Sequence, residues 1–173
     1  MNKIQRQMIL FRISKLSIIG KQCIAVICFE RFCKKYEIKH QGIDEFVNQV
    51  WKITTIGTND FDFEKYAHGF VEMPITGQGD PYPDDLIKAI PENIMDDFNI
   101  FTQSIYEISA TNWYCRYDHE NTTRMFLEVL DVVKKHKIKI PSFNSYLNGS
   151  FDSWRGWGDP LSYEQITEWR KSV

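Results

Sequence analysis

Few side chains in this chain of 173 residues have the types and spacing that metal or redox chemistry needs. The cysteines are Cys23, Cys28, Cys33 and Cys115, and the first three are five positions apart. Five residues of an α-helix turn the side-chain direction by about 140°, so these thiols cannot converge on one metal ion. Neither a CxxC redox pair nor zinc-ligand spacing occurs. We therefore predict free cysteines, packed as small hydrophobic side chains in a reducing compartment.

The histidines give no catalytic pattern either. They are His40, His68, His119 and His136, scattered along the chain. His119 precedes Glu120 directly, and adjacent residues of a helix do not face each other. Gly77 and Gly79 form a lone GxG with no base nearby, and no GxGxxG, Walker-type, GxSxG or HExxH motif occurs. The sequence predicts no catalytic residue, no metal site and no cofactor, and a protein that is not an enzyme.

Charge is divided unevenly along the chain. Residues 1–40 hold nine basic and two acidic residues, whereas residues 59–100 hold ten acidic and two basic residues. The net charge of −2 conceals this division. Two explanations remain open. Either the two segments neutralise each other within the fold, or the acidic segment is a surface that attracts a basic partner.

An acidic surface speeds association with a basic protein, and it can imitate the phosphates that a nucleic-acid-binding protein recognises. Phe61 and Phe63 alternate with carboxylates in this segment, which suits an interface and also a helix with one buried edge. The residues predicted to bind a partner are Asp60, Asp62, Glu64, Asp80, Asp84, Asp85, Asp96 and Asp97.

The basic segment is the alternative binding surface, since its cations could contact nucleic-acid phosphates. They alternate with apolar residues and form no run, which favours a solvated helix face. Trp154 and Trp157 could stack on bases or on a ligand, but packing beneath a glycine-rich turn explains them more simply.

The elements that must position these residues are helices. Ile43, Phe46, Val47 and Val50 recur at the spacing of one helical face. The spacing and the breakers predict helices over residues 2–19, 21–36, 43–55, about 60–68, 83–90, 91–110 and 121–136, and a last short helix in which Ser162 and Gln165 have capping-box register. Gly20 is predicted to separate the first two helices, and Asn59 or Asp60 to cap the fourth.

Residues 74–83 contain three prolines and two glycines, which predicts a long loop. No run of about 18 apolar residues occurs, so no membrane span is expected. Arg12 and Lys15 interrupt the first apolar stretch, which argues against a signal peptide. We predict an all-α fold: one domain over residues 1–173, an irregular helical bundle with a long Pro/Gly loop and an irregular C-terminal tail, located in the cytoplasm.

Two segments resemble the opening helix pair of the helical immunity proteins that accompany contact-dependent growth inhibition and other polymorphic toxins of bacteria. They are residues 24–36 (IAVICFERFCKKY) and 44–51 (DEFVNQVW). The shared pattern is a hydrophobic helix with an aromatic-rich end, followed by a short helix that ends near a tryptophan. The resemblance implies a cytosolic protein that binds and blocks one cognate toxin domain, often a nuclease. It assigns no binding residue.

We therefore expect an immunity protein that neutralises a basic toxin domain, a nuclease, by occluding its active site or substrate surface. Neither a membrane nor direct binding to nucleic acid is expected. The alternative is a nucleic-acid-associated regulatory protein that uses the basic N-terminal segment. A third hypothesis is an enzyme with an unrecognised site, which a cleft with two convergent carboxylates or a His–carboxylate pair would support.

Overall fold

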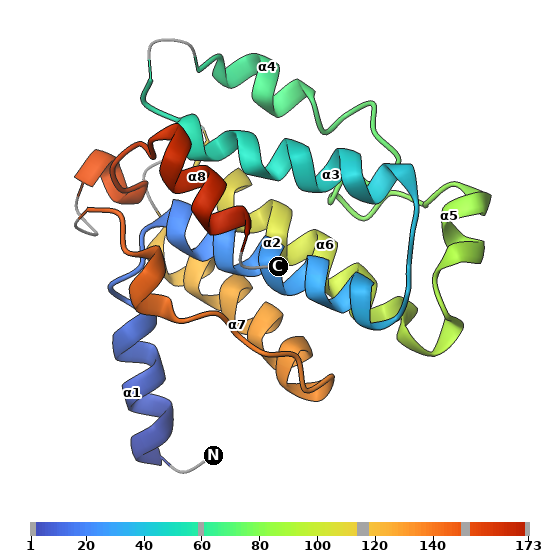
Figure 1. The fold of residues 1–173 in the computed structure, drawn as a ribbon, viewed down its shortest axis with the longest axis horizontal. Helices are drawn as coiled ribbons and strands as arrows, with labels where there is room; N and C mark the ends of the chain where they lie inside the picture. The colour runs from blue at the N-terminus through green and yellow to red at the C-terminus, as the bar shows by residue number, and fades with distance from the viewer. Residues whose placement is uncertain (1–2, 59–60, 114–117, 150–152, 172–173) are drawn as a thin grey trace.

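A helix that is enclosed by other helices forms the centre of the fold. The computed structural model describes residues 3–58, 61–113, 118–149 and 153–171, and in it helix α2 runs from Ile18 to Lys35. Every residue from 18 to 29 is buried. A helix that is buried on all sides needs neighbours on all sides. The helices that surround α2 include α3 (Gln41–Trp51), α6 (Met95–Ala110) and α7 (His119–Lys135) (Figure 1).

These four helices lie side by side, roughly parallel or antiparallel to one another (Figure 1). α2 and α7 run in one direction, and α3 and α6 run in the other. The C-terminal ends of α2 and α7 therefore lie at the same end of the bundle as the N-terminal end of α6. The surrounding helices are α1 (Lys3–Ile13), α4 (Phe63–His68), α5 (Asp84–Ala89) and α8 (Tyr163–Arg170), with 3-10 helices at Lys52–Thr55, Glu92–Ile94, Phe143–Tyr146 and Ser153–Gly156.

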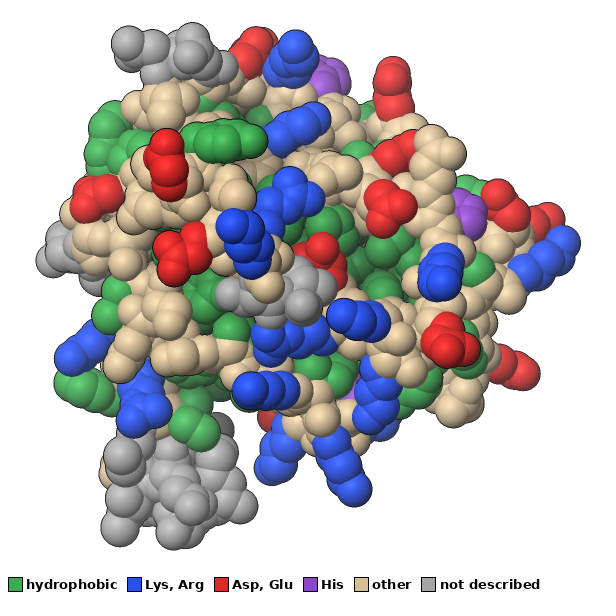
Figure 2. Space-filling model, viewed as in Figure 1, with side chains coloured by type: hydrophobic (Ala, Val, Ile, Leu, Met, Phe, Trp, Pro, Cys, Tyr) green, Lys and Arg blue, Asp and Glu red, His purple; other side chains and the backbone are tan. Residues whose placement is uncertain are grey.

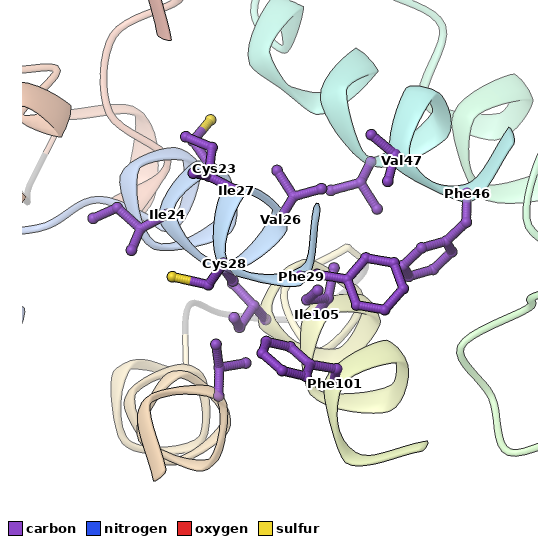
Figure 3. Close-up of a cluster of buried hydrophobic side chains, with 14 of the residues drawn as sticks. Cys23, Ile24, Val26, Ile27, Cys28, Phe29, Phe46, Val47, Phe101 and Ile105 are labelled. Carbon is purple, nitrogen blue, oxygen red and sulfur yellow. The ribbon is translucent and has the colours of Figure 1, made fainter. Parts of the chain in front are cut away.

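Aromatic side chains from three of these helices meet around Phe29 (Figure 3). The Phe29 ring lies 5.8 Å from that of Phe46 in α3, and 5.3 and 5.7 Å from those of Phe98 and Phe101 in α6, centroid to centroid. Aromatic pairs of this kind add about 0.5–1.5 kcal/mol each beyond the burial of their area. The described ranges contain helices and no strand, so the all-α prediction is confirmed.

The boundary between α1 and α2 differs from the prediction. α2 begins at Ile18, and the Ser17 hydroxyl caps it by accepting the N–H of Gly20 at 3.0 Å. Gly20 therefore lies inside α2. A Cβ at this position would lie 2.6 Å from the carbonyl oxygen of Tyr146. Gly20 permits a close approach of two backbone segments, and it does not break a helix.

Other helix starts differ from the prediction as well. α4 begins at Phe63 and is capped by Asp62, three or two residues after the predicted caps Asn59 and Asp60, which lie outside the described residues. α3 begins at Gln41, two residues before the predicted start at Ile43, because His40 caps it. The Nδ1 atom of His40 accepts the N–H of Gly42 at 3.0 Å. α6 begins at Met95 rather than at Pro91, since a 3-10 turn comes first.

The irregular parts agree with the prediction in most respects. Residues 74–83 contain no helix. In α8, the Ser162 hydroxyl accepts the N–H of Gln165 at 3.2 Å, and the Gln165 side chain accepts the N–H of Ser162 at 2.8 Å. This is the predicted capping box. Trp157 is buried, whereas Trp154 is 58% exposed and only the edge of its ring lies beside Gly57.

Cys23, Cys28 and Cys33 are free and buried in the bundle, as predicted, and Cys115 lies outside the described residues. Burial raises the pKa of all three thiols, and that of Cys28 reaches about 12. They are therefore protonated at neutral pH and act as packing groups. Within the described ranges, no helix has the length and the apolar character that crossing a bilayer requires.

Candidate protein-binding surface

The acidic residues predicted to bind a partner lie in three places (Figure 1). α4, which lies along α3, carries Asp62 and Glu64; the long loop and α5 carry Asp80, Asp84 and Asp85; the first turn of α6 carries Asp96 and Asp97. Asp60 lies outside the described residues. The acids of α4 lie away from α5 in Figure 1, so the predicted set does not form one patch.

Asp97 is an internal residue. Its side chain is 6% exposed, and its carboxylate lies 2.7 Å from both Nζ of Lys135 and Nε2 of His136. Burial raises the pKa of this carboxyl group, but hydrogen bonds from Lys135 and His136 outweigh the effect of burial and bring the pKa below its usual value. Asp97 is therefore buried and is not part of the exposed acidic surface, because its carboxylate joins the start of α6 to the end of α7.

The same network reaches α2. The Tyr36 hydroxyl lies 2.6 Å from Nδ1 of His136, so hydroxyl, imidazole and the Asp97 carboxylate are hydrogen-bonded in a line. A nucleophile, a base and an orienting acid have this order in many enzymes. Here the imidazole and the carboxylate are only 8% and 6% exposed. The network accordingly holds three helix ends together rather than opening onto solvent.

The ends of α2 and α7 share a sequence pattern. Residues 34–39 (KKYEIK) and 134–139 (KKHKIK) both read Lys-Lys-aromatic-X-Ile-Lys. In each, the fourth residue has positive φ, 55° at Glu37 and 52° at Lys137. The N–H of Ile38 then donates to the carbonyl of Cys33 and that of Ile138 to the carbonyl of Val133, both at 2.9 Å. These contacts are Schellman closures.

Because α2 and α7 are parallel, these two closures bring their lysines to one end of the molecule. This basic end comprises Lys34, Lys35, Lys39, Lys134, Lys135, Lys137 and Lys139. Figure 2 shows Lys and Arg side chains gathered on the part of this face where Figure 1 places the ends of α2 and α7. The sequence reasoning missed this surface, although the repeated pattern one hundred residues apart was its signal.

The basic residues of the N-terminal segment that the structure describes do not form one surface. Lys21 is buried, and its ammonium donates to the carbonyl of Leu16 at 2.9 Å. Burial lowers the pKa of Lys21 to about 8. Arg31 donates to the carbonyl of Lys139. The segment is thus divided between the core, α1 and the basic end.

Most of the predicted acids that the structure describes are exposed, and they have no basic side chain within ion-pair distance. Asp85 is paired with His40, with Nε2 and the carboxylate 3.2 Å apart, and this hydrogen bond holds the pKa of Asp85 below its usual value. The others have local contacts at most: Asp62 caps α4 and Asp80 accepts from Thr76 at 2.7 Å. Within the described residues, none of Asp62, Glu64, Asp80, Asp84 and Asp96 forms an ion pair. Contact ion pairs within the described residues therefore do not neutralise these five carboxylates.

Five exposed acids around α5 form what we call the acidic edge, which comprises Asp80, Asp84, Asp85, Glu92 and Asp96. Lys88 is the one basic residue within residues 80–97, all of which are described. Acidic side chains are visible along the corresponding right-hand edge in Figure 2. Three of the five acids stand in first turns of α5 and α6, where carboxylates also suit the helix dipole.

A polar cleft of about 440 Å³ lies between α6, α7 and the loop at Gly77. Glu107 and Glu128 both line it, as an enzyme hypothesis would require. Arg124 lies 2.9 Å from the carboxylate of Glu128, and the Ser104 hydroxyl donates to the same carboxylate at 3.1 Å. One of the two carboxylates, that of Glu128, is therefore paired with Arg124.

Comparison of the chain with protein-family models, with curated proteins and with solved structures finds no match.

Proposed function

We propose that this protein is an immunity protein that binds a basic toxin domain, a nuclease, through the acidic edge and blocks it. One observation carries the proposal: Asp80, Asp84, Glu92 and Asp96 are exposed and have no ion-pair partner in the described part of the chain. A surface of one sign increases the rate of encounter with a partner of the other sign and excludes partners of like charge.

The helix that carries the edge is anchored in the core, and the edge has the composition of a binding surface. Leu86 and Ile90 anchor α5 in the core and are 0% and 4% exposed, and the pair between Asp85 and His40 ties α5 to α3. Ile87 lies among the acids with 43% of its surface exposed. A held apolar side chain within a polar rim is the usual composition of an interface, and a preorganised surface loses little conformational entropy on binding.

A nuclease domain suits this edge because an enzyme that binds phosphates presents cations around its substrate. The carboxylates of the acidic edge would bind the cations of the nuclease and so cover its substrate surface without any chemical step. The proposal includes a cytoplasmic location, in keeping with three free, buried thiols.

The test is co-production of this chain with the products of the genes adjacent to its own, with co-purification and growth protection as readouts. The test variant is Asp84→Asn/Asp96→Asn, on the acidic edge. The matched control is Glu120→Gln/Glu168→Gln, which removes the same charge from exposed residues of α7 and α8. We expect weaker protection by the edge variant alone. Absence of a retained partner, or equal loss in both variants, would overturn the proposal.

One observation favours the alternative, a nucleic-acid-associated function: the basic end gathers lysines from two parallel helices. Titration with duplex DNA and with RNA at two salt concentrations decides this alternative. Phosphate contacts give affinity that falls steeply with salt, by a slope of about −0.9 per contact on duplex DNA. Binding without such a slope would eliminate it.

A further inference from the structure

A hollow surface lies between the C-terminal half of α1 and α7. α1 extends away from the bundle, and the chain that follows α7 passes close to it (Figure 1). A groove of about 380 Å³ lies between α1, α7 and residues 140–144, and a second hollow of about 310 Å³ adjoins it. Arg12, Phe143 and Asn144 line both. We call the two hollows together the α1–α7 groove.

The walls of this groove are largely apolar. The larger hollow is lined by Ile9 of α1, Leu127 and Leu130 of α7, and Ile140 and Phe143 of the following segment. At the smaller hollow, Phe11 and Leu147 are 62% and 45% exposed. Large apolar side chains that remain exposed together on a polar surface mark sites of interaction.

The rim of the groove is positively charged. Arg12 and Lys134 line the larger hollow and Lys15 lines the smaller one, against one acid, Asp131. Neither Arg12 nor Lys134 forms an ion pair with a described residue. Ile140, which lines the groove, directly follows Lys139 of the basic end in the sequence. Positive charge therefore continues along the surface from the groove to the basic end.

We propose that the α1–α7 groove binds an acidic amphipathic helix of a partner protein. Such a helix repeats apolar side chains at i, i+3, i+4 and i+7 and carries carboxylates beside them. The apolar residues would enter the two hollows on either side of Phe143, and the carboxylates would face Arg12, Lys15 and Lys134.

The shape of the surface distinguishes a protein helix from other anionic partners. Interfaces with nucleic acid are polar and follow the phosphates, whereas the lining of this groove includes phenylalanine and leucine. A bilayer presents a broad face, whereas the apolar atoms here lie in a concave groove between two helices. An isolated helix with one apolar face matches both the shape and the charge.

This inference does not depend on the proposed function. The acidic edge selects a basic partner and the groove selects an acidic helix, so the two surfaces bind different segments. Failure of the immunity assay would leave the groove untouched, and failure of helix binding would leave the edge untouched.

The test is selection from a displayed library of 20-residue helical peptides on the full-length protein, followed by anisotropy measurements with the best synthetic peptide. We expect enriched peptides to be net negative and to show helical spacing of apolar residues. Arg12→Glu and Lys134→Glu should each weaken binding about tenfold because they place carboxylates at the rim. Ile140→Asn should weaken it at unchanged charge.

The matched control is Lys88→Glu, which makes the same charge change on α5 and should leave peptide affinity unchanged. Circular dichroism melts of every variant separate loss of binding from loss of folding, and Arg12→Ala serves as a milder second variant. The proposal is overturned if enriched peptides lack negative charge, or if rim and control variants bind alike. It is also overturned if vesicles of phosphatidylserine or duplex DNA compete for the groove more strongly than the peptides.

Discussion

Replacement of Asp97 by asparagine isolates the contribution of the network that joins α2, α6 and α7. The change keeps the size of the side chain and removes the negative charge shared by Lys135 and His136. The Lys135 side chain is 64% exposed, so its ammonium can return to water at little cost. The His136 side chain is 8% exposed, and its Nε2–H loses a charged acceptor in a place that water reaches poorly.

Leaving one buried donor with a weaker acceptor costs about 1–3 kcal/mol, and we expect about 2 kcal/mol for Asp97→Asn. In a protein of this size, each kcal/mol lowers the melting temperature by about 2–4 °C, so the midpoint should fall by about 4–8 °C. The assay is thermal unfolding followed by circular dichroism. The neighbouring variant Asp96→Asn is the control, since Asp96 is exposed and should change stability by about 0.5 kcal/mol.

The same variant has a predicted pH dependence. The folded-state pKa of Asp97 lies below the unfolded value of about 3.9, so its stabilisation is complete well above that pH. It is lost as the pH falls through the folded-state pKa. The stability difference between wild type and Asp97→Asn should therefore shrink in acid. The reasoning is refuted if Asp97→Asn is no more destabilising than Asp96→Asn, or if the difference between wild type and Asp97→Asn persists undiminished in acid.

Three further predictions concern the bundle. Gly20→Ala should destabilise the fold by about 1–3 kcal/mol, because its methyl group would lie 2.6 Å from the carbonyl oxygen of Tyr146; urea unfolding measures this cost. Ser162→Ala should destabilise α8 by about 1 kcal/mol and increase amide exchange at Gln165, and unchanged exchange would contradict the capping box. In a Cys115→Ser background, a thiol reagent should label Cys28 and its two buried neighbours only upon unfolding; rapid labelling of the native protein would contradict their burial.

Local patterns in the sequence were enough to predict most helices. The apolar spacing around Phe46 and the capping box at Ser162 depend on residues a few positions apart. The place of Gly20 inside α2 does not follow from local pattern, because the need for glycine there comes from the backbone of Tyr146, far along the chain. A glycine in a helix and a glycine that ends one look the same in sequence.

The candidate site shows the same limit. The acidic composition around α5 predicted an exposed surface, and the structure leaves those carboxylates exposed. Asp97 has the same residue type and stands in the same helical turn as Asp96, yet its partners Lys135 and His136 come from another helix. Only the packing of α6 against α7 decides which of two adjacent aspartates is buried. The α1–α7 groove likewise depends on segments distant in sequence.

The acidic edge as the binding surface for a basic protein is the central claim, and the association rate tests it most directly. The measurement is stopped-flow mixing of this protein with the purified basic domain that it retains in the co-purification test, at low and at physiological salt. We predict that Asp84→Asn/Asp96→Asn slows association about tenfold at low salt and reduces its salt dependence, while Glu120→Gln/Glu168→Gln does neither. Equal association rates for the two variants would contradict the claim.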